Sequence, residues 1–267
     1  MKNLKDKLDD HIYKNEFTEK LLRAEEHFLN ILKHCDNQFE IGTGSYLFEG
    51  IDYEYSIEMY PKQKLLYEKS KKAKEILEIG TYMGHSILIM LLANPNAKIT
   101  SIDINDRYSL PAINYLKEKF PMAEINFLKG SSLDILPTLN KKYDFFHIDG
   151  SHLNHIIVKE FNLCRKISNN NIFNVIFDDI DSCVKLKKNI INSFKKIDIF
   201  EPICKWNNCH MLIQLSNEDR INEKENLIFN RLNRLDFIKD YLKIFFKNIR
   251  RLPKKAIKGI SLYFKSL

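Results

Sequence analysis

The feature that most constrains the fold is a regular alternation of short apolar segments with amphipathic segments through the middle of the chain. The short segments have the length of buried strands, which we expect at residues 75–79, 98–104, 124–128, 143–148 and 172–177. The longer segments have helical spacing, and we expect helices at residues 86–93, 111–120, 132–139, 153–167 and 183–194. Strands that alternate with helices predict a mostly parallel, doubly wound α/β sheet.

The rest of the chain is expected to surround this core. Two late apolar segments, 197–204 and 210–215, would bring the sheet to seven strands, so we expect the core to span residues 63–216. Residues 1–62 combine charged helical segments with a Gly- and Tyr-rich loop, and we expect them to form an N-terminal helical lid. Residues 217–267 are predicted to form a basic helical tail.

Small and acidic residues follow the first two predicted strands, at the tips where such sheets bind ligands. In the segment LEIGTYMGHS, Gly80 allows a tight turn and Gly84 allows the following helix to pack closely. Ser86 opens that helix, whose free N–H groups favour an anion. An ordinary strand–turn–helix would also carry this glycine pair. Asp103 ends the second strand, where a carboxylate can accept hydrogen bonds from ribose hydroxyls, or where it can serve as a cap or turn residue.

Polar residues also follow the next three predicted strands. Ser131 and Ser132 offer hydroxyl and backbone donors to a base edge, or simply an N-cap for the following helix. Asp149 ends the fourth strand, and Asp178 and Asp179 end the fifth. Three carboxylates at adjacent tips repel one another unless a cation lies between them. Oxygen ligands suit Mg²⁺, Mn²⁺ or Ca²⁺, although a helix cap is the alternative role for the last aspartate.

Taken together, the chain from about residue 74 to residue 182 resembles the class I S-adenosylmethionine-dependent O-methyltransferases. LEIGTYMGHS is similar to the family's E-x-G-x-x-x-G-x-S motif, and GSSLDILPTL is similar to its adenine-binding segment. HIDGSH and FDDI are similar to the metal-binding strands of the divalent-cation-dependent kind, which includes catechol O-methyltransferase and macrocin-type sugar O-methyltransferases. The resemblance implies a Rossmann-like fold, S-adenosylmethionine as cofactor and a divalent cation, Mg²⁺ before the others.

The resemblance also implies a role for each matched residue. The expected cofactor-binding residues are Glu78, Gly80, Thr81, Gly84 and Ser86 at the methionine portion, Asp103 at the ribose, Ser131 and Ser132 at the adenine, and Asp149 near the amino group. Asp149, Asp178 and Asp179 would hold the metal, and His152 would act as general base. The usual Pro-Gly-Gly turn before the fifth strand is absent from this chain.

The chemistry of histidine supports a base at this place, because its pKa lies near neutrality. The alternative for His152 is a polar surface residue that opens a helix. His155 lies one turn later as a substitute base, and His147 is expected to be a buried, hydrogen-bonded strand residue. The expected acceptor is a hydroxyl of a small molecule, sugar or glycan. The lid offers it stacking faces from Tyr46, Phe48, Tyr53, Tyr55 and Tyr60.

Charge is distributed unevenly along the chain. The net charge is +7 over 267 residues, and residues 217–267 alone hold 13 basic and 6 acidic residues. The remaining body is therefore balanced, which argues against a nucleic-acid-binding face. The amphipathic stretch at 235–267 can dock on the body, form a homodimer or lie on an anionic membrane surface; nucleic acid is the least favoured partner.

The N-terminus is charged throughout, no apolar run reaches 18 residues, and the five cysteines are scattered. These features predict a cytoplasmic protein with reduced thiols, peripheral at a membrane if the tail binds one. Two other functions stay open: a methyltransferase that acts on RNA or protein, and a methyltransferase-like binding module without turnover. A nicotinamide-dependent dehydrogenase is disfavoured because the chain lacks a G-x-G-x-x-G motif.

Overall fold

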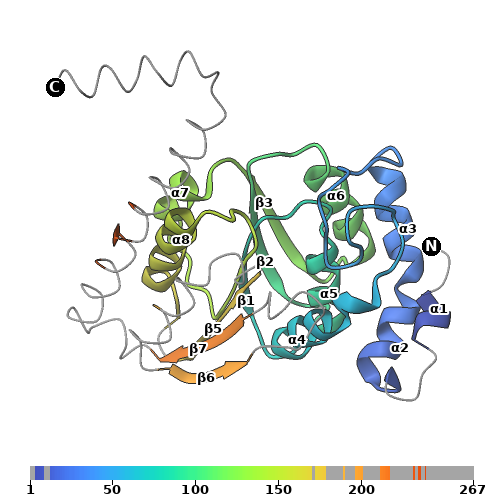
Figure 1. The fold of residues 1–267 in the computed structure, drawn as a ribbon, viewed down its shortest axis with the longest axis horizontal. Coiled ribbons are helices and arrows are strands. Elements are labelled where there is room, and N and C mark those ends of the chain that lie inside the picture. The colour runs from blue at the N-terminus through green and yellow to red at the C-terminus, as the bar shows by residue number, and fades with distance from the viewer. Residues whose placement is uncertain are drawn as a thin grey trace, which may run out of the picture.

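A seven-stranded sheet lies at the centre of the computed structural model (Figure 1). The structure describes residues 4–8, 13–169, 172–178, 189, 196–200, 211–216, 231, 234–235 and 238. The strands are β1 (Glu75–Ile79), β2 (Lys98–Asp103), β3 (Glu124–Lys129), β4 (Phe145–Ile148), β5 (Ile172–Phe177), β6 (Lys196–Phe200) and β7 (Met211–Ser216). Their order is β3-β2-β1-β4-β5-β7-β6.

Neighbouring strands from β3 to β5 are parallel, whereas β7 runs antiparallel between β5 and β6. The predicted α/β fold with a mostly parallel sheet is confirmed. Chain order reverses between β1 and β4, which lie side by side at the middle of the sheet. In open α/β sheets the crevice beyond the strand ends at such a reversal is where ligands bind.

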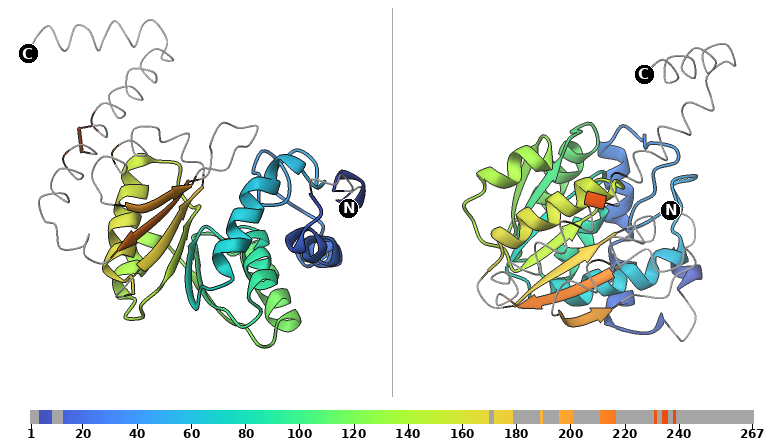
Figure 2. Two further views of the ribbon diagram at one scale, coloured as in Figure 1. Left: turned by 90° about the horizontal axis from the view of Figure 1, so that it is seen from below. Right: turned by 60° about the vertical axis from the view of Figure 1, so that its left-hand side comes forward.

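Helices cover both faces of the sheet (Figure 2). The helices are α1 (Leu4–Lys7), α2 (Glu16–Arg23), α3 (Glu25–His34), α4 (Tyr60–Ser70), α5 (His85–Ala93), α6 (Ser109–Lys119), α7 (Ser132–Ile135) and α8 (Asn154–Lys166), with 3-10 turns η2 (Ile57–Met59) and η3 (Leu136–Thr138). In the left view of Figure 2, the sheet lies between α8 in yellow-green and α4 and α5 in cyan, with the N-terminal helices in blue outside them.

Alternate residues of each strand build two separate hydrophobic cores, because successive side chains point to opposite faces. Ile76 and Phe145 join the core shared with α2 to α6, while Leu77 and Phe146 join the core under α8. Every residue of β4 is buried, as expected for an apolar strand at the middle of a parallel sheet. The polar residues that occur on these strands must therefore find partners within the protein.

The N-terminal region differs from its prediction. Helix α4 begins at Tyr60, because Pro61 occupies the first turn, where its missing N–H costs nothing. The loop aromatics Tyr46, Phe48 and Tyr55 are at most 2% exposed and pack into the core of α2 to α6. Their predicted role as stacking faces for an acceptor is therefore wrong for most of them, since only Tyr46 reaches the cavity described below.

Several predicted segments lie outside the described residues. They include most of the helix expected at 183–194 and nearly all of the tail at 217–267. Helix 132–139 is instead a short α7 that continues as the η3 turn. Among the residues that the structure describes, no helix combines the length and apolar character needed to cross a bilayer. The boundaries expected for lid, core and tail stay a prediction.

Candidate functional site

A cavity of about 870 Å³ opens at the carboxyl ends of β1, β2, β3 and β4. The loop between α3 and α4 forms one wall of it, through residues 42–46, Glu49 and Ile51 among others. The expected site residues that line the cavity are Gly80, Thr81, Ser86, Asp103, Ser131, Ser132, Asp149, His152 and Asp178. Sequence reasoning therefore identified much of the lining. Glu78 and Gly84 are not among the lining residues, and Asp179 lies outside the described part of the chain.

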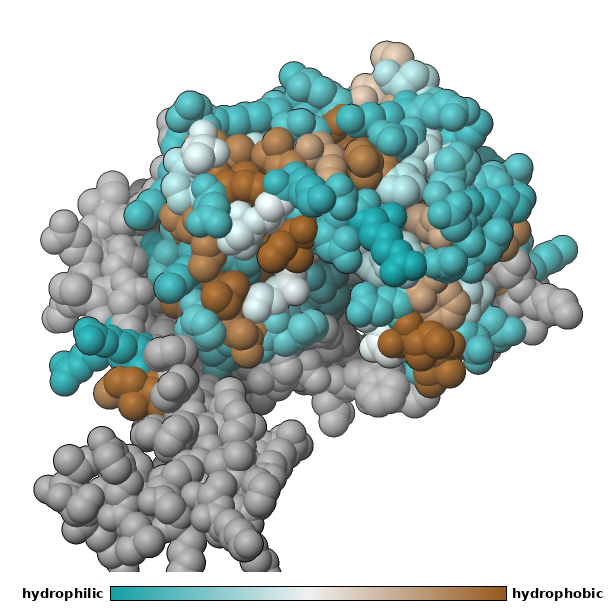
Figure 3. Space-filling view, turned by 90° about the horizontal axis from the view of Figure 1, so that it is seen from above, coloured by the Kyte–Doolittle hydropathy of each residue, from teal (hydrophilic) through white to brown (hydrophobic). Residues whose placement is uncertain are grey.

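The surface around the cavity mixes polar and apolar residues. Figure 3 shows a mostly hydrophilic face that carries several separate groups of hydrophobic residues, in brown. Two cavity-lining isoleucines, Ile51 and Ile104, are 71% and 74% exposed. Exposed isoleucines at the border of a cavity favour a ligand with an apolar part.

The turn after β1 requires glycine. Gly80 has φ +91°, and a Cβ atom there would lie 2.1 Å from the carbonyl oxygen of Asp149. Tyr82 also has a positive φ, of 45°, a conformation that costs a non-glycine residue free energy. Asp103 Oδ2 accepts hydrogen bonds from the backbone N–H groups of Thr81 at 2.9 Å and Tyr82 at 2.8 Å. Asp103 thus holds the turn, which was the alternative role considered for it, and it lines the cavity as well.

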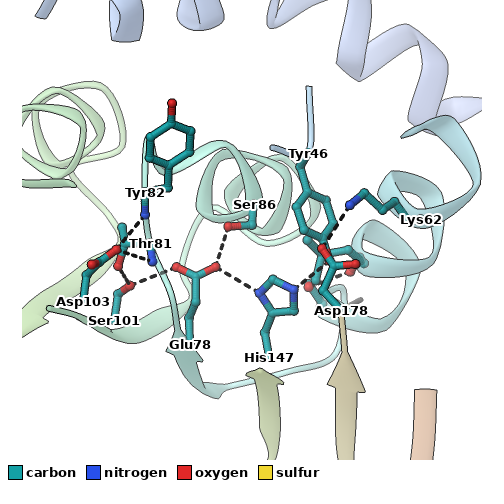
Figure 4. Close-up of polar contacts among 12 residues, drawn as sticks. Tyr46, Lys62, Glu78, Thr81, Tyr82, Ser86, Ser101, Asp103, His147 and Asp178 are labelled. Atoms are coloured by element: carbon teal, nitrogen blue, oxygen red, sulfur yellow. Dashed lines mark hydrogen bonds and ion pairs between the residues drawn. The ribbon is translucent and has the colours of Figure 1, made fainter. Parts of the chain in front are cut away.

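A row of polar residues crosses the sheet on the face of α5. Register pairs Glu78 with Ser101 of β2 and with His147 of β4, so the three side chains share one face. Glu78 accepts hydrogen bonds from Ser101 Oγ at 2.9 Å and, on its other oxygen, from Ser86 Oγ at 2.5 Å. His147 Nδ1 lies 3.1 Å from that same oxygen (Figure 4). Glu78 is therefore a fully buried carboxylate with three protein partners.

His147 extends this row to the loop wall. Its Nε2 lies 2.6 Å from the hydroxyl of Tyr46, and the ring is fully buried. The predicted buried, hydrogen-bonded histidine is confirmed. Gln63 of α4 donates a hydrogen bond to the backbone carbonyl of Tyr46, and Tyr55 donates one to Gln63. This part of the loop is thereby fixed to both the sheet and α4.

A second histidine fixes the same loop. His85 Nδ1 lies 2.8 Å from Ser45 Oγ, and its Nε2 lies 2.8 Å from the hydroxyl of Tyr53. Burial lowers the pKa of His85 to about 3, because the charged imidazolium would lose its hydration. The neutral ring is therefore the form that the fold holds at neutral pH. Sequence reasoning missed this residue, whose only signal was its place beside Gly84.

Two of the three predicted metal ligands converge. Ligand atoms of Asp149, Asp178 and His147 lie within 4.8 Å of one another, whereas Asp179 lies outside the described residues. Lys62 Nζ of α4 lies 3.0 Å from Asp178 Oδ2, and both side chains are almost fully buried. Lys62 also lies 4.6 Å from the centre of the Tyr46 ring. The ammonium group therefore compensates the carboxylate at this strand tip, a contact that the sequence did not reveal.

The two candidate bases lie in different settings. His152 is exposed and lines the cavity, just beyond the tip of β4. His155 is half-buried in the first turn of α8 and is not among the lining residues. Desolvation, with the nearby Lys159, lowers the pKa of His155. Of these two histidines, His152 is therefore the one whose side chain can contact a ligand in the cavity.

The cavity lining includes a glutamate that sequence reasoning missed. Ser132 Oγ, at the start of α7, donates a 2.5 Å hydrogen bond to Glu160 Oε1 of α8. Glu160 is 1% exposed and lines the cavity. Burial raises the pKa of its carboxyl, although the bond from Ser132 partly opposes that shift. The predicted adenine-binding serine is thus joined to an unpredicted buried acid.

Comparison with known proteins shows that the central part of the chain is similar to methyltransferases. A family model described as a methyltransferase domain matches residues 77–180. Mouse (Mus musculus) catechol O-methyltransferase is 31% identical over 101 residues, which cover 34% of this chain and 38% of the mouse protein. The tapetum-specific methyltransferase 1 of Arabidopsis thaliana is 29% identical over 93 residues, covering 33% of this chain and 40% of the plant protein. The chain thus spans less than two thirds of these relatives.

Solved structures share the fold across a longer stretch. The O-methyltransferase TomG of Streptomyces achromogenes, in complex with SAM, superposes with a TM-score of 0.52 at 16% identity, covering 74% of this chain and 96% of TomG. An O-methyltransferase of Bacillus cereus, in complex with SAH, gives a TM-score of 0.51 at 14% identity, covering 72% of this chain and 91% of that protein. At such low identity these structures establish the fold alone.

Proposed function

We propose that this chain, whose residues 77–180 form a class I S-adenosylmethionine-dependent methyltransferase domain of the catechol O-methyltransferase-like kind, methylates a hydroxyl group of a small molecule. The observation that carries the proposal is the cavity at the tips of β1 to β4, within the matched segment. S-adenosylmethionine would supply a methyl group on a sulfonium centre. The protein's task in such a transfer is mainly to align donor and acceptor.

The residues present fit that cofactor. Gly80 and Thr81 line the cavity at the tip of β1, and the Asp103 carboxylate, which already accepts the N–H groups of this turn, lines it at the tip of β2. Ser131 and Ser132 line the cavity at the tip of β3. Amino-acid, ribose and base portions of a nucleoside cofactor would thus meet donors and acceptors from three successive strands.

The size of the cavity supports a small acceptor over RNA or protein. Its volume of about 870 Å³ is within the range of small-molecule sites, roughly 300–1,000 Å³. The exposed Ile51 and Ile104 at its border suit an apolar ring or the apolar face of a sugar. A catechol-like phenol and a sugar hydroxyl are both compatible with this lining.

His152 is the proposed general base. It lines the cavity and is exposed, so an acceptor hydroxyl can approach its ring. Removal of the hydroxyl proton as the oxygen attacks would raise the rate, typically by 10²–10⁴-fold for a well-placed base. His155, which does not line the cavity, provides a matched control on the same segment.

A divalent cation is the proposed third component. Carboxylate oxygens of Asp149 and Asp178 converge, which suits Mg²⁺ or Mn²⁺. A bound cation would orient an acceptor with vicinal oxygens and lower its hydroxyl pKa. The Lys62 ammonium on Asp178 compensates one negative charge, so a cation must share that carboxylate with Lys62 or displace it.

The first experiment is thermal unfolding with the demethylated product, S-adenosylhomocysteine. At 100 times its dissociation constant a ligand adds about 2.7 kcal/mol, a shift of several degrees for a chain of this size. The same titration with NADH serves as a control for nonspecific nucleotide binding. Absence of any shift with S-adenosylhomocysteine would contradict the proposal and favour a binding module of another kind.

The base is tested with a pair of variants. His152→Ala should bind S-adenosylhomocysteine as the wild type does and lose roughly 10²–10⁴-fold in kcat with an acceptor found by screening phenols and sugars. His155→Ala should retain activity within a few-fold. Equal losses in the two variants would remove His152 from the proposed role.

The cation is tested by adding Mg²⁺ to the complex with S-adenosylhomocysteine. The melting temperature should rise further, and EDTA should reverse the increment. Asp149→Asn should abolish it, whereas Asp134→Asn, at an exposed position of α7, should leave it unchanged. If the rise in melting temperature with Mg²⁺ persists in Asp149→Asn, the cation binds elsewhere. If methyl transfer is insensitive to EDTA, the reaction does not require a divalent cation.

A further inference from the structure

Lys62 carries the only ammonium group among the described residues that line the cavity. It is 6% exposed and lies in the first turn of α4 (Tyr60–Ser70), which contains no acidic residue. The helix dipole disfavours a positive charge at this end of a helix, and lysine is rarely buried unless it is paired. The position is therefore unfavourable for a lysine unless a neighbouring group compensates its charge.

Asp178 supplies that compensation at the tip of β5. Lys62 Nζ lies 3.0 Å from Asp178 Oδ2, and the two side chains are 8% and 4% exposed (Figure 4). Removing one partner of such a buried pair leaves the other charge uncompensated away from water. Asp178 is also one of the two carboxylates proposed to hold the divalent cation. The ammonium group of Lys62 thus already occupies part of the site that the cation would need.

The charges at these strand tips accommodate one cation more readily than two. Asp149 and Asp178 contribute two negative charges, and Lys62 reduces the sum to one. His147 completes the cluster, but both of its ring nitrogens already lie within hydrogen-bond distance of other side chains. A divalent cation beside the ammonium group would make the sum positive, and on a shared oxygen the two would lie only about 5 Å apart. The cation and Lys62 therefore compete for Asp178.

The ring of Tyr46 gives the ammonium group a partner that does not depend on Asp178. Lys62 Nζ lies 4.6 Å from the centre of that ring, within the range of a cation–π contact. The lysine stem is flexible and borders the cavity, so the ammonium group can leave the carboxylate without entering the hydrophobic core. Displacement of Lys62 by a cation therefore does not leave an isolated charge in an apolar place.

We propose that Lys62 is a built-in competitor of the divalent cation: it pairs with Asp178 in the cation-free protein, and the cation binds only as the ammonium group leaves that carboxylate. The inference rests on the proposed function, because it needs a cation held by Asp149 and Asp178. Lys62 then lowers the affinity of the site for divalent cations, and it compensates the strand tip whenever no cation is bound.

The inference is tested by titrating the full chain, in complex with S-adenosylhomocysteine, with Mn²⁺ and measuring free Mn²⁺ by electron paramagnetic resonance. Lys62→Met keeps an unbranched side chain without the charge, and it should bind Mn²⁺ at least about tenfold more tightly than the wild type does. Lys64→Met, at an exposed position of the same helix, should leave the affinity unchanged. Equal affinity in the wild type and Lys62→Met would overturn the inference, whereas no binding of S-adenosylhomocysteine would overturn the proposed function itself.

A second variant separates competition from a structural role. Lys62→Arg keeps the positive charge, and its guanidinium group can hold a carboxylate through two parallel hydrogen bonds, so it should bind Mn²⁺ at least about threefold more weakly than the wild type. A merely structural lysine would make both substitutions weaken binding. A folded Lys62→Arg protein with wild-type or higher affinity would overturn the inference even if Lys62→Met does not fold. If S-adenosylhomocysteine binds but Mn²⁺ binds to none of these proteins, the inference and the proposed cation are both wrong.

Discussion

Among the described residues, each face of the sheet buries a glutamate, and the two glutamates differ in how many hydrogen bonds the protein supplies to them. Glu78 lies on the face of α5 and has three protein partners, which occupy both of its oxygens. Glu160 lies on the face of α8 and has one partner, on one oxygen. The hydrogen-bonding capacity of Glu78 is thus used on both oxygens, whereas Glu160 keeps one buried oxygen without a partner among the described residues. Glu78 is therefore held by side chains of β2, β4 and α5, while Glu160 depends on a single bond from Ser132.

The largest expected effect removes the satisfied member of this pair. Glu78→Ala would leave Ser86, Ser101 and His147 without their shared acceptor in a buried place. We expect the free energy of unfolding to fall by about 3–5 kcal/mol, as for other broken buried pairs. Urea unfolding measures it. Glu118→Ala, at an exposed ion pair, is the control and should cost under about 1 kcal/mol.

A second expected effect depends on pH and concerns the other buried network of the α5 face. His85 has a folded pKa of about 3 against an ordinary 6.5, so below pH 6.5 only the unfolded state gains its proton. Its contribution is complete above pH 6.5 and is lost as pH falls toward 3, at up to about 1.4 kcal/mol per pH unit. By pH 5 the loss should reach about 2 kcal/mol.

Urea unfolding across pH 7 to 5 checks this, with His85→Gln as the test variant. The variant should show a shallower decline than the wild type over that range, because its side chain does not titrate. His34→Gln changes an exposed histidine and should decline as the wild type does. Parallel curves for wild type and His85→Gln would mean that the ring is protonated within the fold.

A smaller effect is expected where the loop joins the satisfied row. Tyr46→Phe removes the hydroxyl that is hydrogen-bonded to His147 Nε2 in a buried place, and we expect the free energy of unfolding to fall by about 1–2 kcal/mol. Tyr115→Phe is a matched control, because its hydroxyl meets His27, a half-buried ring that water can reach. The control should cost less; the reverse order would show that the Tyr46 bond is not made in solution.

The smallest effect is expected at the unsatisfied glutamate. Glu160→Ala removes one hydrogen bond, from Ser132, and also removes a buried oxygen that has no protein partner. We expect a loss of about 1 kcal/mol or less in the ligand-free protein, since the serine can turn toward water in the cavity. Chemical denaturation of Glu160→Ala and Glu78→Ala under the same conditions compares their losses in unfolding free energy. A loss as large as that of Glu78→Ala would make the two glutamates equivalent and erase the distinction.

Local pattern was sufficient to predict the sheet and most of the cavity lining. Apolar runs such as that of β4 leave few alternatives to a buried strand, and strand tips in a parallel sheet meet at one edge. Gly80 was identified because it directly follows β1, and Asp103 because it ends β2. The sequence immediately around these residues was therefore enough to predict that they lie at strand ends.

Contacts between distant segments could not be read in this way. Tyr46 meets His147 from 101 positions away, and Lys62 meets Asp178 from 116 positions away. Neither contact follows from periodicity, and the loop aromatics were therefore assigned to the acceptor rather than to the core. Glu160 did carry a local signal, because it lies between Ile157 and Phe161 on the buried stripe of α8. A charge within an apolar stripe is a reason to look for a partner.

The loop of residues 41–56 contains no helix or strand, yet it is fastened at His85 and at His147. Its opening requires breaking buried bonds, so its motion should be slower than its irregular backbone suggests. Backbone amides such as that of Ser56, which donates to Leu47, should resist hydrogen exchange nearly as well as those of a helix. The loop would then be in its binding conformation before a ligand arrives. The rate of turnover would be limited by ligand entry and exit rather than by closure of the loop.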